Sequence, residues 1–130
     1  MCVAPDMWRR VGSADAAARA PSADEDAPPE RGATNACFHE LDTHVRAGQG
    51  DRLAFVQEAN GRTATYSELW AASVACAWAL RDTYAMTVGD RALLVLRATI
   101  DAIVCVQACK RSAIVYVPVS AATPHEAVRD

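Results

Sequence analysis

Residues 92–117 decide the fold, and they read ALLVLRATIDAIVCVQACKRSAIVYV. Two continuous apolar runs, at 92–96 and 114–117, flank a segment in which Thr99 can cap a helix that continues to about Lys110. Apolar runs without alternation are typical of strands that are covered on both faces, as in parallel sheets. The order strand, helix, strand therefore predicts parallel strands joined by a right-handed crossover, which makes the chain an α/β protein.

The helix within this stretch supplies the core between the two strands. We expect Ile103 and Val106 to enter that core, so that a charge placed at Ile103 would be costly. Cys105 and Cys109 lie four residues apart and share a helical face. Small buried cysteines are the ordinary explanation of such a pair in an apolar helix.

A hairpin is predicted before this stretch. A compact apolar run at 53–56 is followed by the turn sequence Asn60-Gly61, and residues 62–65 then return as a second strand.

Two further helices are predicted on either side of the hairpin. At 36–47 the apolar positions recur at intervals of three and four, and Gly48 follows as a stop. Thr65 and Glu68 have the spacing of a capping box, in which each side chain satisfies a backbone N–H group that a helix start leaves free. A helix should therefore begin after Thr65, and its apolar face can be followed to Tyr84.

The first 34 residues differ in composition from the rest. They contain no Leu, Ile, Phe or Tyr but four of the six prolines. Such a segment buries too little apolar surface to order itself, which predicts a disordered leader at 1–34. The alternative is a docking arm built on Met7 and Trp8. We therefore place the folded domain at 35–130, where a last helix begins at 124–127.

Composition excludes several classes of protein. Thirteen Lys and Arg against 16 Asp and Glu give a net charge of −3, so nucleic acid is not expected as a partner. The five cysteines form no CxxC pair, which argues against a disulfide framework or a zinc knuckle. No apolar run approaches the roughly 18 residues of a membrane span. We expect a cytoplasmic protein, while Arg9, Arg10 and Arg19 among small residues leave a mitochondrial presequence open.

Candidate catalytic side chains are scattered along the chain. His39 and His44 lie five residues apart and so on different helix faces, and His125 is remote in sequence. Cys37 and His39 are two residues apart and do not form a local dyad. Three carboxylates on later elements are interpreted as caps, turn residues or solvated groups: Asp82, Asp90 and Asp101.

The loop between the first long strand and its helix is where a nucleotide phosphate could bind. This loop, residues 97–99, reads Arg-Ala-Thr and has no glycine that would let the backbone approach a pyrophosphate. We therefore expect no catalytic, cofactor-binding or metal-binding residue in this chain.

The order of motifs nevertheless resembles the beginning of the adenylate-forming acyl-CoA synthetases, most closely those that activate acetate or propionate. The motifs are NACF at 35–38, LDTHV at 41–45, GDRLAF at 50–55, ATYSEL at 64–69, VGDRAL at 88–93, QACKRSA at 107–113 and PHEA at 124–127. The resemblance implies that residues 35–130 are a partial AMP-dependent synthetase/ligase amino-terminal subdomain. On this basis the fold is an incomplete amino-terminal part of the large domain of an adenylate-forming enzyme.

Several positions depart from the family pattern. Arg97-Ala98 stands where these enzymes carry a proline, and Ser112-Ala113 stands where they carry a glycine. Residues 116–119 are more similar to the wider superfamily, and residues 121–122 replace a glycine pair near the CoA channel. The acyl substrate is therefore left open, and we carry over no binding residue.

The resemblance implies ATP, Mg and CoA as cofactors and a small carboxylate as substrate for the full-length enzymes. The phosphate loop and the catalytic lysine of that family lie beyond the motifs matched here, so we expect this chain to be inactive alone. Open strand edges are expected to favour association with a partner. The alternatives are a stand-alone α/β interaction module, or a piece of a longer-chain acyl-CoA or amino-acid-adenylating enzyme.

Overall fold

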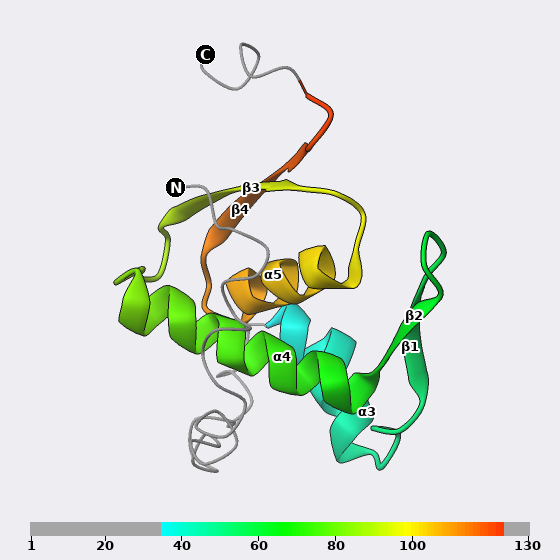
Figure 1. The fold of residues 1–130 in the computed structure, drawn as a ribbon. Coiled ribbons are helices and arrows are strands. Elements are labelled where there is room, and N and C mark those ends of the chain that lie inside the picture. Colours follow the sequence, from blue (N-terminus) through cyan, green and yellow to red (C-terminus); the bar gives the residue numbers. More distant parts are fainter. Residues whose placement is uncertain (1–34, 124–130) are drawn as a thin grey trace.

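The computed structural model describes residues 35–123 (Figure 1). The predicted leader at 1–34 and the helix start at 124–127 lie outside the described residues. In chain order the elements are η1 (Phe38–Asp42), α3 (Thr43–Arg46), β1 (Leu53–Gln57), β2 (Arg62–Thr65), α4 (Tyr66–Trp78), η2 (Ala79–Thr83), β3 (Arg91–Leu96), α5 (Ile100–Arg111) and β4 (Val115–Ser120). The segments η1 and η2 are π-helical turns: η1 leads directly into α3, and η2 directly follows α4.

The strands β3 and β4 form a two-stranded parallel sheet joined through α5. Arg91 pairs with Val115 at one end and Leu96 with Ser120 at the other. The predicted parallel pairing and helical crossover are therefore confirmed, as Figure 1 shows.

The two faces of this sheet are covered unequally. Ala92 and Leu94 are buried against the helices, and Tyr116 packs against the same core. Side chains alternate along a strand, so the residues between them form an opposite, aliphatic surface, here called the outer face: Leu93, Val95, Val115, Val117 and Val119. Val115 is 50% exposed and Val117 is 46% exposed. The prediction that both faces of the strands are covered is wrong for residues 35–123, because α5 lies against one face only.

The hairpin is confirmed. β1 and β2 pair antiparallel, with an irregularity between Leu53 and Phe55. Gly61 in the connecting turn has φ +68, in the left-handed region that glycine enters at no steric cost. The predicted turn sequence therefore contributes the backbone conformation that the hairpin needs.

The start of α4 is the capping box that the spacing predicted. The Thr65 N–H donates to Glu68 Oε2 at 2.8 Å, and the Glu68 N–H donates to Thr65 Oγ1 at 3.2 Å. The helix continues through η2 and ends at Tyr84, as expected. Local hydrogen bonds alone are enough to place this helix start.

The core lies between α4 and α5 and is built largely from small side chains. The buried residues of these helices include Leu69, Cys76, Val104 and Cys109, and Leu80 of η2 is buried beside them. The expectation for the face of α5 is only partly right. Ile103 and Val106 are half-buried, whereas the neighbouring Val104, Cys105, Ala108 and Cys109 are buried. The side of α5 that is buried is therefore not the expected one, because α4 packs against the side that carries the small residues.

The end of α5 has the geometry of a glycine-terminated helix without the glycine. The Ile114 N–H donates to the Cys109 carbonyl at 2.9 Å, and the Ala113 N–H donates to the Lys110 carbonyl at 3.3 Å. These are the two bonds of a Schellman motif, whose αL position is usually glycine. Ala113 holds that position with φ +52. This is the site at which the resembled family carries a glycine.

Candidate functional site

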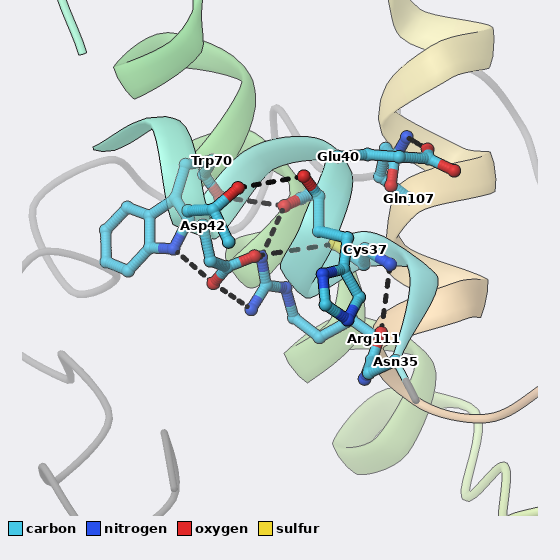
Figure 2. Close-up of polar contacts among 10 residues, drawn as sticks. Asn35, Cys37, Glu40, Asp42, Trp70, Gln107 and Arg111 are labelled. Carbon is cyan, nitrogen blue, oxygen red and sulfur yellow. Dashed lines mark hydrogen bonds and ion pairs between the residues drawn. The ribbon is translucent and has the colours of Figure 1, made fainter. Parts of the chain in front are cut away.

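A set of buried polar contacts joins the first helix to α4 and α5 (Figure 2). At its centre is Asp42, the last residue of η1, whose exposed fraction is 2%. We call Asp42, Trp70 and Arg111 the Asp42 cluster. Three separate elements contribute one residue each.

The contacts of Asp42 are short and complementary. Arg111 donates from Nη1 to Oδ1 at 2.9 Å and from Nη2 to Oδ2 at 2.8 Å. Trp70 donates from Nε1 to Oδ1 at 2.9 Å. Figure 2 shows both side chains converging on the carboxylate. A bidentate guanidinium together with an indole N–H satisfies a buried carboxylate and fixes its orientation.

A second set of contacts lies beside the first, at the surface. Glu40 accepts hydrogen bonds from Gln107 Nε2 at 2.5 Å and from Lys110 Nζ at 2.7 and 2.8 Å. The hydrogen bonds from Lys110 and then from Gln107 hold the pKa of Glu40 below its usual value. We call Glu40, Gln107 and Lys110 the Glu40 cluster. Together the two clusters attach η1 to the last two turns of α5.

The thiols near these clusters are not activated nucleophiles. Cys37 is fully buried, and burial raises its pKa to about 11, so the group is protonated at neutral pH. Its Sγ donates a long contact to Asp42 Oδ2 at 3.9 Å. Burial likewise raises the pKa of Cys109 to about 11. A hydrogen bond with Cys105, together with burial, raises the pKa of Cys76. The same hydrogen bond lowers the pKa of Cys105. Cys105 and Cys109 are both buried, which fits the interpretation of these helical cysteines as core residues.

The histidines considered in the sequence are held in separate contacts. His39 lies edge-on to the Phe38 ring at 5.5 Å between centroids. His44 meets Gln49 Oε1 through Nδ1 at 3.3 Å and lies over the Tyr66 ring. His125 lies outside the described residues. Within residues 35–123, no group of three or more His, Cys, Asp or Glu side chains is arranged to hold a metal ion.

The three carboxylates expected in caps and turns have different environments. Asp90 accepts from the Thr87 N–H at 2.6 Å and from its hydroxyl at 3.0 Å, and the backbone bond is the larger cause of its lowered pKa. Asp82 lies exposed in η2. Asp101 instead pairs with Arg62 Nη1 at 3.0 Å and links α5 to the hairpin. The turn assignment is confirmed for Asp90, whereas Asp101 has a long-range partner.

The N-terminus of α5, where an anion could bind in principle, is satisfied by the protein itself. The Ile100 N–H donates to Gln57 Oε1 at 3.2 Å, and the Ala102 N–H donates to Thr99 Oγ1 at 3.2 Å. Thr99 is thus the cap that its position predicted. A phosphate would have to displace these oxygens, so the geometry disfavours phosphate binding at residues 97–99. The broader expectation of no catalytic or ligand residue stays a prediction.

Sequence reasoning missed the Asp42 and Glu40 clusters. Asp42 and Arg111 are 69 positions apart, and Glu40 and Lys110 are 70 apart, so no spacing rule for helices or strands joins them. The available signal was the resemblance, since 41–45 and 107–113 are two of its motifs. No helix within residues 35–123 is long and apolar enough to cross a membrane.

Comparison with known proteins agrees with these motifs. The profile of the AMP-binding enzyme family matches residues 41–130, which include the whole Asp42 cluster and, of the Glu40 cluster, Gln107 and Lys110. This chain belongs to the AMP-binding enzyme family. The match confirms the resemblance drawn from the motifs and the α/β fold expected from it.

The relatives of this AMP-binding family member are much longer. The acetyl-coenzyme A synthetase of Burkholderia lata is 39% identical over 85 residues, which are 63% of this chain and 13% of the relative. That of Burkholderia mallei is 34% identical over 108 residues, which are 78% of this chain and 16% of the relative. The crystal structure of CmiS6 is similar with a TM-score of 0.65 and 30% identity, covering 79% of this chain and 25% of that one. The chain thus spans about a sixth or less of these synthetases.

Proposed function

We propose that this chain supplies part of an AMP-forming carboxylate–CoA ligase acting on a short-chain acid such as acetate or propionate. The observation that carries the proposal is the 34–39% identity to two acetyl-coenzyme A synthetases over most of the described residues. The ligase reaction joins a carboxylate to AMP with Mg-ATP and then transfers the acyl group to CoA. Small carboxylate, ATP, Mg and CoA are accordingly the ligands of the whole enzyme.

The role of the described residues in such an enzyme is to build a scaffold. Both polar clusters are satisfied by protein groups, the nearby thiols Cys37 and Cys109 are protonated, and the start of α5 is occupied by Gln57. Adenylation requires groups that position and neutralise the phosphates of ATP. The 130-residue sequence has no glycine-rich phosphate loop. We therefore expect no activity from this chain alone and propose that it acts in the cytoplasm as part of a larger catalytic unit.

Pyrophosphate exchange tests this proposal directly. The purified 130-residue chain is assayed for carboxylate-dependent exchange of pyrophosphate into ATP with acetate, propionate and a longer acid. A mock purification from cells lacking the gene controls for contaminating synthetase. Exchange at the control level is expected. Exchange well above the control, from a soluble monomer, would show a complete site in this chain and contradict the proposal.

A second candidate is a small interaction module without ligase chemistry. The observation that favours it is the aliphatic outer face of β3 and β4, with Val115 and Val117 about half exposed. The two candidates differ in whether an assembly containing this chain activates a carboxylate. Exchange restored in an assembly with a synthetase remainder supports the ligase role, and binding without exchange supports the module.

A further inference from the structure

We infer that the outer face of β3 and β4 is a docking surface for an amphipathic helix carried by the remaining part of an AMP-binding enzyme. The inference rests on the proposed function and adds to it the location and chemistry of the interface between this chain and the rest of the enzyme. The outer face consists of five aliphatic side chains in register on two strands: Leu93, Val95, Val115, Val117 and Val119.

The register makes these residues one continuous surface. Leu93 pairs with Val117 and Val95 pairs with Val119, while Val115 lies opposite Arg91, an exposed residue that borders the aliphatic surface on the same side of the sheet. Paired residues of a parallel ladder point to the same side of the sheet. Apolar surfaces that are contiguous, rather than scattered singly, mark interaction sites in soluble proteins.

The sheet type indicates what covers the surface. Parallel sheets occur almost only with both faces covered, and in α/β proteins the covering elements are helices. Here α5 covers one face, and none of the elements within residues 35–123 covers the other. A helix that packs on aliphatic strands presents an apolar stripe and keeps its polar side in solvent.

The length of the relatives indicates where such a helix comes from. The matched region is 13–16% of the two acetyl-coenzyme A synthetases, so more than four-fifths of each relative lies outside the match. The sheet and helices described here belong to the same family fold. The remaining part of such an enzyme is therefore the occupant to which the outer face is fitted.

The experiment is co-expression of the full 130-residue chain with the Burkholderia lata acetyl-coenzyme A synthetase from which the matching segment has been deleted. We expect the two polypeptides to co-purify through a tag on the short chain and to run as a one-to-one complex. The double variant Val115→Lys/Val117→Lys should weaken the complex by about thirtyfold or more, because it places two charges in the interface. The matched control is Val88→Lys, an exposed valine in the turn before β3 that is not one of the five outer-face residues.

Both variants are checked for folding by circular dichroism and thermal unfolding of the short chain. If the lysine pair prevents folding, the near-isosteric Val115→Thr/Val117→Thr variant takes its place and should weaken the complex by a smaller factor. Loss of binding by a folded outer-face variant, with binding retained by Val88→Lys, supports the inference. Failure of the wild-type chain to co-purify, or equal binding by the outer-face variant, overturns it. A homodimer of the short chain that the same variant dissociates also overturns it, because the occupant is then a second copy.

The same preparation separates this inference from the proposed function. A valine-dependent complex that catalyses no pyrophosphate exchange leaves the docking surface standing and contradicts the ligase role. If the assembly catalyses pyrophosphate exchange and the outer-face variant does not weaken it, the ligase role is supported and the docking surface is contradicted.

Discussion

Asp42 and Glu40 lie two residues apart on one helical turn, and each meets a basic residue near the end of α5. Their contact distances are nearly the same, at 2.8 Å to Arg111 and 2.7 Å to Lys110. Their surroundings differ, since the Asp42 side chain is 2% exposed and the Glu40 side chain is 46% exposed. Burial, rather than distance, therefore decides how much the stability of the fold depends on each ion pair.

The physical reason is solvent. Around Glu40, water competes with Lys110 and screens its charge, so the pair gains little over two solvated ions. Around Asp42, the carboxylate has already lost its water on folding, and the hydrogen bonds from Arg111 and Trp70, with a long contact from the Cys37 thiol, compensate for that loss. Removing one member of the Asp42 cluster therefore exposes the full desolvation cost of the others.

The largest expected effect is that of Asp42→Asn. The amide keeps the size of the side chain but takes the counter-charge away from Arg111, and we expect a loss of about 3 kcal/mol in the free energy of unfolding. Urea unfolding followed by circular dichroism measures it. Glu40→Gln is the matched control on the same turn. A loss below about 1 kcal/mol for Asp42→Asn would break the contrast between the two pairs.

A double-mutant cycle sharpens the same contrast. Asp42→Leu alone and Arg111→Met alone each leave one partner of a buried pair, so each should be strongly destabilising. The combined variant replaces the whole pair by apolar groups and should be more stable than the sum of the single losses predicts, by roughly 1–2 kcal/mol. Simple additivity in urea unfolding would mean that the pair is not coupled.

A smaller effect, this time a gain in stability, is expected at Ala113, which follows Lys110 and Arg111 at the end of α5. Ala113→Gly removes the Cβ from a residue at φ +52 and should raise the free energy of unfolding by about 1 kcal/mol. The control Ala71→Gly, on the exposed side of α4, should lower it by about the same amount. Thermal unfolding of both variants decides the question, and a destabilised Ala113→Gly would contradict the strain assigned to this position.

The smallest effect is expected for Glu40→Gln, below about 1 kcal/mol at neutral pH. The pKa of Glu40 is lowered in the folded chain from its ordinary value of 4.5, so the pair stabilises above that value. Its contribution is lost as pH falls through the folded-state pKa. Wild type and Glu40→Gln should therefore converge in stability in acid, as measured by urea unfolding between pH 7 and pH 3.

The elements of this protein were largely predictable because their causes are local. The hydrogen bonds of the Thr65 capping box and the Thr99 cap join residues three apart, and the left-handed Gly61 lies in a short turn. Such groups are satisfied or strained by their immediate neighbours, so the order of residues is enough to place them. Unbroken apolar runs likewise indicated β3 and β4 and their parallel pairing.

What only the tertiary structure decided depends on residues far apart in the chain. The periodicity of α5 allowed either Ile103 or Val104 to face the core, and packing against α4 selected Val104. The pairing of Asp42 with Arg111 joins positions 69 residues apart, and no local pattern encodes it. The outer face is exposed at Val115 and Val117 although its sequence is as apolar as the buried face. The hydropathy of these strands predicted that their side chains pack against other elements. Which side of the sheet is buried depends on where α5 packs, and only the assembled fold determined that.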